Sequence, residues 1–493
     1  MHESSTSKIA GESKSSPKSL LLPAAIALSL FCLGSSDCGG GKKGAVNPSA
    51  PNVAIVTPSP SAAGPAFPAP VLNGVIPVAI PGLDATRSPE QARPFFDTFS
   101  WQSFVALSWP AVPGQRGAAL NPSDPKSLLT APNGTVVVWG TYKESFELFG
   151  QRDQRPTAWE LFANKIPECK DQPEGVKLLV MLTKGDSILD ETKQAFSFPL
   201  IDQNRNYARY EVRYNKAFYN FVRGSDSDPK SWLYQIANLA RVEPISMPAS
   251  PVTNAAPPDA IGALMVKAAW REMTDKDDRN RYYVVSALLY DPVTQNCVQK
   301  DMGLVGLHIA QKLSGFPEWI WSSFEQVDNV KRGPGAAPTT PISFNNGTDD
   351  PKTIRGYANR PGQKGPVMVP PAQRTPVQVT RLNPIPNTPA GASTLEVNVA
   401  WQQALKGTVW QNYELVITQW PSDPTTFKTK EAGGIYPRDC GLAFPADGAT
   451  NTTMETYFQS PQDAIGAGGN SCMACHYVAG QSDFSWGLNR RAH

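Results

Sequence analysis

The chain has 493 residues, of which 41% are hydrophobic and 18% are charged, so a folded core is expected and general disorder is excluded. The length allows two or three domains, or a single large β-rich domain. The net charge is +2, a balance that favours neither nucleic acid nor an acidic partner.

The N-terminal region is typical of an export signal. Lysines precede an apolar run at 20–33, which is too short to span a bilayer comfortably and matches the core of a signal peptide. Cys38 and a run of glycines follow, as at the start of a bacterial lipoprotein, although Ser-Ser-Asp at 35–37 departs from the usual sequence before such a cysteine. Residues 1–38 therefore predict export to the periplasm or the outer membrane. Lipidation of Cys38, simple cleavage and an uncleaved anchor all stay open.

Two Pro-rich stretches divide the rest of the chain. Residues 39–94 are rich in Pro, Ala, Gly and Ser and predict a flexible tether. Residues 333–391 are dense in Pro, Gly, Asn and Thr and predict a long surface loop or a linker between lobes. An α+β lobe at 95–332 and a C-terminal lobe at 392–493 remain.

The apolar spacing predicts a mixture of helices and strands. Apolar residues three and four apart predict a buried helix over 95–107. Further helices are expected at 214–222 and 399–405, and strands at 135–139, 177–182, 282–290 and 413–420. Strands and helices do not alternate regularly, and no Gly-rich phosphate loop occurs. The sequence therefore predicts a mixed α+β fold with a largely antiparallel sheet, and not a doubly wound nucleotide-binding fold.

The clearest chemical signal lies near the C-terminus, where Cys472, Cys475 and His476 form a Cys-x-x-Cys-His motif. Two thiols at this spacing can each add to a vinyl group of haem, and the adjacent imidazole can reach the iron. At this composition the motif is expected by chance in roughly one chain per thousand. A zinc site would need a second pair of cysteines, and a thioredoxin-like pair would follow a strand of a βαβ unit. The short C-terminal segment is therefore predicted to carry one covalent haem c, with His476 as an iron ligand.

The second axial ligand of the iron stays open. No Met follows Met473, so the ligand that small c-type cytochromes often take from downstream is missing. The candidates are His308, in a glycine-bordered apolar run, and, with weaker claims, His493 and Met454. His308 could bind the iron, form a hydrogen bond beside it, or pack as a structural residue.

Other polar residues in apolar surroundings have weaker claims. Lys267 and Arg271 could neutralise haem propionates, although a solvated or salt-bridged face is the more common role for such a pair. Glu325 and Asp328 could pair with these cations or orient His308, and a structural role is their default.

Three cysteines remain outside the signal and the motif: Cys169, Cys297 and Cys440. In an oxidising compartment they predict one disulfide and one free thiol. The sequence does not choose the pair.

Six segments also carry a family resemblance: SWQSFVALSWP (100–110), GLH (306–308), PEWIWSSFE (317–325), NTTMET (451–456), NSCMACH (470–476) and DFSW (483–486). In these the chain resembles a group of exported bacterial cytochrome c family proteins, from about residue 95 to the C-terminus. The resemblance implies haem binding and redox activity, with Cys472 and Cys475 as thioether attachment points and His476 as axial ligand. It identifies no substrate.

Two functions follow as expectations. The first is electron transfer by a monohaem cytochrome with His476 and His308 on the iron, serving a redox partner protein of unknown identity. The second is a peroxidase- or oxygenase-like haem enzyme with an open or labile sixth site, in which His308 acts as acid and base. The chain is large for a simple carrier, which keeps the second alternative open. A gas sensor fits less well, because no signalling or DNA-binding segment accompanies the motif.

Overall fold

The computed structural model describes residues 67–83, 87–149, 155–162, 169, 177–179, 199–241, 245–251, 260–291, 296–331, 342–347, 372, 374–421, 443–445, 448–459, 471–476, 479 and 482–492. The predicted export segment with Cys38, much of the predicted linker, Cys440 and His493 lie outside the described residues. No helix within these ranges is long and apolar enough to cross a membrane.

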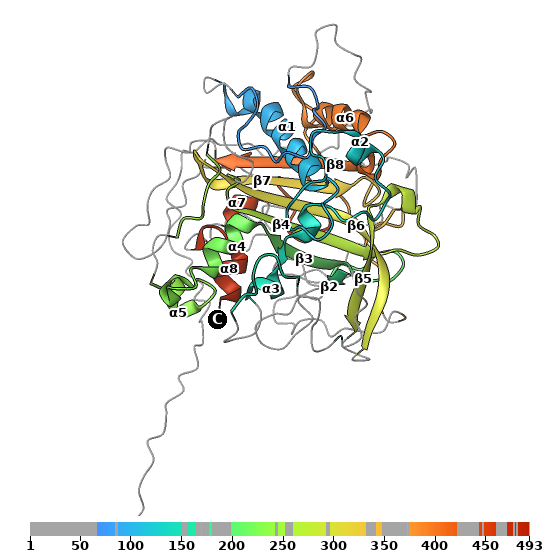
Figure 1. Cartoon of the computed structure of the whole chain (residues 1–493). Coiled ribbons are helices and arrows are strands. Elements are labelled where there is room, and N and C mark those ends of the chain that lie inside the picture. The colour runs from blue at the N-terminus through green and yellow to red at the C-terminus, as the bar shows by residue number, and fades with distance from the viewer. Residues whose placement is uncertain are drawn as a thin grey trace, which may run out of the picture. The chain divides into compact units, whose positions relative to one another are not determined.

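A nine-stranded sheet forms the centre of the structure, in the order β1-β3-β4-β6-β7-β8-β9, with β5 beside β6 and β2 beside β5 (Figure 1). Every strand pair in it is antiparallel except β2 with β5. The mixed, largely antiparallel α+β class is therefore confirmed. The strands are β1 Lys143–Glu144, β2 Lys177–Leu179, β3 Arg209–Tyr214, β4 Leu264–Glu272, β5 Val284–Asp291, β6 Asn296–Leu313, β7 Phe316–Gln326, β8 Tyr413–Pro421 and β9 Ala443–Phe444.

The sheet continues across the stretch that the sequence marks as a boundary between lobes. Strand β8 comes after the predicted linker at 333–391, yet it pairs along β7, with Trp321 opposite Gln419 and Glu325 opposite Glu414. Every residue of β8 is buried. A strand that is buried on both faces needs cover on both sides, so helices and loops from the two predicted lobes pack against one sheet.

Eight α-helices are described: α1 Pro89–Leu107, α2 Lys126–Leu129, α3 Ser145–Phe149, α4 Lys216–Arg223, α5 Ile236–Leu239, α6 Thr394–Ala404, α7 Cys472–His476 and α8 Trp486–Arg491. Helix α1 begins with a capping box, in which Ser88 Oγ accepts from Gln91 N and Gln91 Oε1 accepts from Ser88 N, so the two N–H groups at its start are satisfied. It therefore starts within the predicted tether, where Phe67 and Ile76 are also buried. The folded part begins earlier than the composition predicted.

The predicted helices at 95–107, 214–222 and 399–405 correspond to α1, α4 and α6, and the strands at 177–182, 282–290 and 413–420 to β2, β5 and β8. The strand predicted at 135–139 is wrong. Its residues form one isolated bridge, from Val137 to Pro110, and lead into a 3-10 turn at Trp139–Thr141. Glycines at 134 and 140 interrupt the apolar run on both sides, and such residues end a strand.

Two layers cover opposite faces of the sheet. Helices α1 and α6 lie on one face, where Ser100 Oγ is 2.7 Å from both Ser322 Oγ and Thr418 Oγ1. The neighbours of those two residues, Trp321 and Gln419, point to the other face because side chains alternate along a strand. Helices α4, α7 and α8 lie on that other side (Figure 1).

The open disulfide pairing is resolved. Cys169 is bonded to Cys297 on β6, with the two Cα atoms 5.4 Å apart, a normal spacing for this bond. The bond attaches Cys169 to the sheet.

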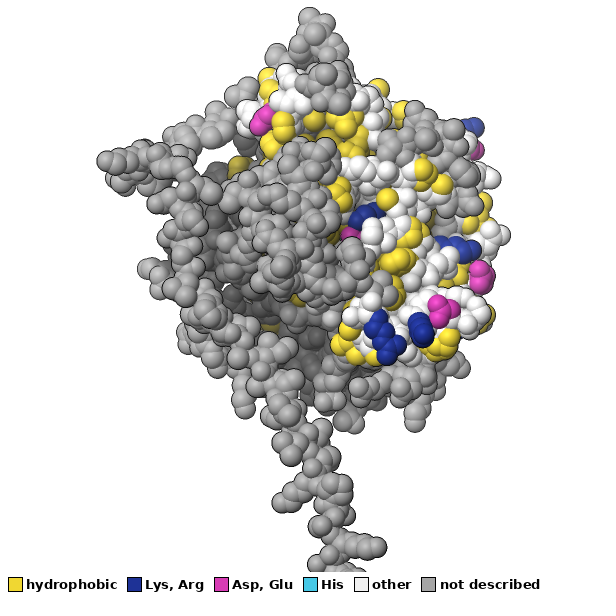
Figure 2. All heavy atoms as spheres, turned by 90° about the vertical axis from the view of Figure 1, so that its left-hand side faces the viewer, with side chains coloured by type: hydrophobic (Ala, Val, Ile, Leu, Met, Phe, Trp, Pro, Cys, Tyr) yellow, Lys and Arg dark blue, Asp and Glu magenta, His cyan; other side chains and the backbone are white. Residues whose placement is uncertain are grey.

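On the side that Figure 2 shows, the described residues present no dominant charge. Basic, acidic and hydrophobic side chains of the described residues lie interspersed there. This mixture agrees with the net charge of +2.

Candidate functional site

The Cys-x-x-Cys-His motif forms a single helical turn, α7, which is held on the sheet by Gln419 of β8. The fully buried amide accepts a hydrogen bond from Met473 N at 2.8 Å through Oε1 and donates to Ser471 Oγ at 2.9 Å through Nε2. The first N–H groups of a helix have no partner inside the helix. Gln419 satisfies one of them and so fixes where the motif sits.

His476 has one nitrogen committed and one available. Its Nδ1 lies 2.7 Å from the backbone carbonyl of Phe484. A carbonyl oxygen can only accept, so Nδ1 carries the proton and Nε2 keeps its lone pair. Burial lowers the pKa of His476 to about 4, although the Phe484 carbonyl opposes the shift. The ring is therefore neutral near pH 7, and metal-bound histidines usually make this same second hydrogen bond.

The Phe484 carbonyl is presented by a strained turn. Asp483 and Phe484 have φ values of 49° and 62°, which cost on the order of 1 kcal/mol or more for residues other than glycine. Contacts of the Asp483 carboxylate hold the turn: Oδ1 is 2.7 Å from Lys312 Nζ, and Oδ2 accepts from Met247 N at 2.7 Å. This fixes the orientation of the His476 ring.

Two tryptophans flank His476. The ring centroid of Trp321 lies 4.3 Å from that of the imidazole, and the Trp486 ring lies 6.5 Å away on edge. Trp321 is also fixed from its other end, because its Nε1 donates to the backbone carbonyl of Glu318 at 2.8 Å. These rings shield the imidazole from water.

The two motif thiols are half-buried. Cys472 Sγ lies 3.6 Å from Ala449 O, and burial raises the pKa of this thiol. It is therefore protonated at neutral pH. Two half-buried thiols on one turn, with a neutral imidazole that offers Nε2, fit a covalently bound haem c.

The sheet face near α7 carries a polar row. Strand register places Lys267, His308 and Ser323 side by side on β4, β6 and β7. Ile417 of β8 continues the row and belongs to the apolar cluster that packs against Cys472. His308 and Lys267 also contribute to the electrostatic environment of His476. Lys267 and His308 therefore lie on the motif's side of the sheet.

The loop at 448–459 crosses this face and brings Glu455 to His308. Glu455 Oε2 lies 3.4 Å from His308 Nε2. Burial opposes ionisation of Glu455, but the charge and hydrogen bonding of His308, together with the charge of Lys267, lower its pKa overall. The ionised form of Glu455 is therefore favoured beside His308.

The same loop is anchored at its start. Glu325 accepts from Thr452 N and lies 2.8 Å from Arg381. Asn451 Nδ2 donates to Phe324 O at 2.9 Å. Gly306 of β6 lies underneath, and a Cβ atom there would collide with Thr453 Oγ1. The lack of a side chain at this position lets the loop approach the sheet.

The other residues that the sequence analysis named as candidates have structural surroundings of their own. Met454 is fully buried in an apolar cluster that does not include the motif residues. Arg271 is buried between Asp202 and Asp277, at 3.3 and 2.7 Å. Arg271 therefore has the salt-bridged role, which is the more common one for such a residue.

Glu325 and Asp328 also have structural partners. Glu325 anchors the 448–459 loop, and Asp328 lies 2.6 Å from Arg281. Their structural default therefore holds. His493 lies outside the described residues.

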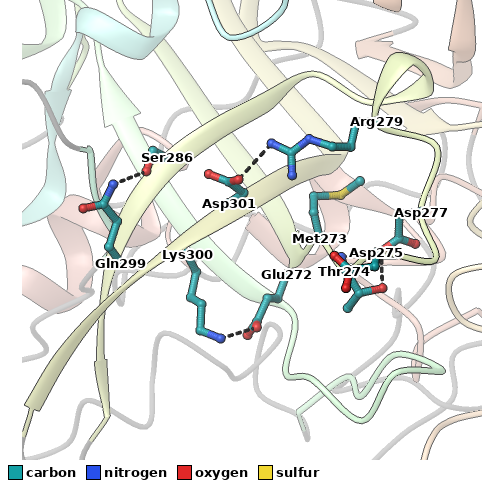
Figure 3. Close-up of a pocket in the computed structure, with 10 residues that line it drawn as sticks. All are labelled: Glu272, Met273, Thr274, Asp275, Asp277, Arg279, Ser286, Gln299, Lys300 and Asp301. Carbon is teal, nitrogen blue, oxygen red and sulfur yellow. Dashed lines mark hydrogen bonds and ion pairs between the residues drawn. The ribbon is translucent and has the colours of Figure 1, made fainter.

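A separate polar cavity of about 480 Å³ lies at β4, β5 and β6 (Figure 3). Three pairs of its lining side chains bond to each other: Lys300 to Glu272 at 2.6 Å, Arg279 to Asp301 at 2.9 Å and Gln299 to Ser286 at 2.7 Å. These charges are neutralised in pairs, so the cavity gives no chemical reason to place the site there.

No protein-family model, curated protein or solved structure matches the chain. Within the described ranges, no group of three or more His, Cys, Asp and Glu side chains is arranged to hold a metal ion.

Proposed function

We propose that this protein is an exported c-type cytochrome that binds one haem covalently and transfers electrons to or from a redox partner protein. The observation that carries the proposal is the hydrogen bond from His476 Nδ1 to Phe484 O, because it leaves Nε2 free on the turn that also carries both thiols. When bound, haem c supplies a one-electron iron couple.

Each residue of the site has a task under this proposal. The thiols of Cys472 and Cys475 would attach the haem, and Nε2 of His476 would bind its iron. Gln419 positions the turn, and the Phe484 carbonyl orients the imidazole and raises its basicity. Lys267, half-buried in the polar row, is a candidate partner for a propionate.

We propose His308 as the second residue that would hold the iron, because it lies on the same side of the sheet as α7. To bind through Nε2 it must turn away from Glu455. The existing contact of 3.4 Å between the two instead favours the second candidate function, a haem enzyme in which His308 and Glu455 exchange a proton beside an open site.

Export is proposed from the N-terminal sequence, with lipidation of Cys38 as one form of attachment. The disulfide between Cys169 and Cys297 supports an oxidising compartment. Cell fractionation of the full chain beside a Cys38→Ser variant tests both points: a membrane-bound wild type and a released variant support lipidation, and a cytoplasmic wild type overturns export.

The deciding experiment is the optical spectrum of the protein co-expressed with the haem-attachment machinery, followed by haem staining after denaturation. We expect covalent haem in the wild type and none in the Cys472→Ala/Cys475→Ala variant. A Cys169→Ser/Cys297→Ser variant is the control and should keep its haem. A wild type without covalent haem would overturn the proposal.

Carbon monoxide separates the two candidate functions. Electron transfer is supported if the ferrous wild type is low-spin and does not bind carbon monoxide, while the His308→Ala variant does bind it. A wild type that binds carbon monoxide readily supports the enzyme, and Glu455→Gln should then slow its reaction with peroxide.

A further inference from the structure

Glu318 of β7 is a buried carboxyl group without a partner. Its side chain is 2% exposed, and no other residue donates a hydrogen bond to either carboxyl oxygen in the described part of the chain. An ionised carboxylate in such a place is costly unless it is paired. The site therefore favours the protonated form, and burial raises the pKa of Glu318 to about 7.

Two charged groups face Glu318 from neighbouring elements. Lys312 of β6 limits the rise in its pKa, and Asp483, from the turn before α8, adds to it. Lys312 Nζ already lies 2.7 Å from Asp483 Oδ1 and donates to Pro317 O at 2.6 Å. The cation is thus neutralised by Asp483, which leaves Glu318 as the unpaired acid of this cluster.

The cluster is connected to His476 along two short routes. On the first, the backbone carbonyl of Glu318 accepts from Trp321 Nε1, and the Trp321 ring packs on the imidazole. On the second, Asp483 directly precedes Phe484, whose carbonyl accepts from His476 Nδ1. A charge change at the iron would therefore act on Glu318 through a buried, poorly screened region.

We propose that Glu318 binds a proton when the iron is reduced and releases it on oxidation, so that the protein couples electron transfer to proton transfer. The inference rests on the proposed function. Glu318 gains one proton from solvent and becomes a neutral acid as the iron gains one electron from the redox partner. The added negative charge raises the proton affinity of a nearby carboxyl, and both transfers reverse on oxidation.

The test is the reduction potential of the haem-loaded protein, measured across about two pH units on either side of neutrality. The wild-type potential should fall as the pH rises through this range, and the Glu318→Gln potential should stay constant. Asp97→Asn is the matched control, since Asp97 is also buried with a pKa raised by burial to about 6 but lies on α1, on the opposite face. It should keep the wild-type slope.

Infrared difference spectra between the reduced and oxidised wild type give a second readout. Reduction should produce the carbonyl band of a protonated carboxyl, and Glu318→Gln should lack it. A wild type with neither slope nor band, or a slope that persists in Glu318→Gln, overturns the inference. If Glu318→Gln does not fold, the wild-type band and a shifted slope in Glu318→Asp decide. A chain without covalent haem would instead contradict the proposed function.

Discussion

The two faces of the sheet are built from different chemistry. On the α1 and α6 face, neutral hydroxyls and aromatic rings dominate: Trp101 Nε1 donates to Asn398 at 2.8 Å, and its ring stacks on Trp401. On the α7 face, half-buried ionisable groups gather, with Glu455 beside His308 and Lys267 along the same row. The first arrangement holds elements together, and the second leaves ionisable groups half-buried beside the motif.

Adjacent residues of the same strands serve the two faces. On β8, Thr418 bonds to α1 and Gln419 holds α7. On β7, Ser322 bonds to α1 and Trp321 packs on His476. Rigid strands whose α1 and α6 face is well packed thus support the site on the opposite face. We expect that each face can be altered separately.

Trp101→Ala should have the largest effect on stability. The side chain is fully buried, and truncating such a residue costs about 3–5 kcal/mol. Denaturant unfolding should show this loss, while the spectrum of the folded, haem-loaded protein stays unchanged. Val399→Ala on α6 is the control, since Val399 is 60% exposed. A changed spectrum in Trp101→Ala would show that the two faces are not independent.

The sequence predicts features that depend on near neighbours. The period of apolar residues predicts α1, and the Cys-x-x-Cys-His spacing predicts the chemistry of α7. The contacts that complete the candidate site join residues far apart in the chain, such as Gln419 with Met473 and Glu455 with His308. No local pattern reports these pairs, and a lone histidine in an apolar run does not reveal which nitrogen it offers.

Asp97→Asn should change how stability depends on pH. Burial raises the pKa of Asp97 from 3.8 to about 6, despite hydrogen bonds from Thr394 and Thr418. The folded carboxyl keeps its proton to higher pH than the unfolded one, so wild-type stability falls as the pH rises from about 4 to 6. Relative to the variant this fall is at most about 3 kcal/mol. Unfolding free energies measured at several pH values check it, and parallel curves for the two proteins would contradict it.

Gly306→Ala should disturb the α7 face through the 448–459 loop. The new Cβ would meet Thr453 Oγ1 and Met454 Cε, and overpacking of this kind costs about 1–3 kcal/mol. Because the loop carries Glu455, the environment of His308 should change as well, seen as a shifted optical spectrum. Gly140→Ala, where only ordinary contact with Val137 is expected, is the control. If the Gly306→Ala protein is destabilised but its spectrum is unaltered, the 448–459 loop does not influence the surroundings of His308.

Gln419→Leu should have a smaller effect on stability and a specific effect on α7. The substitution leaves Met473 N and Ser471 Oγ without their partner, and a buried group left unsatisfied costs about 1–3 kcal/mol. The motif turn should loosen, so the variant should carry less covalent haem per chain than the wild type. Gln402→Leu on α6, which removes a bond to Tyr413 O, is the matched control and should load haem normally. Equal haem content in both variants would mean that β8 does not position the motif. The difference between the two faces in haem binding would then depend on His476 and the turn at Phe484 alone.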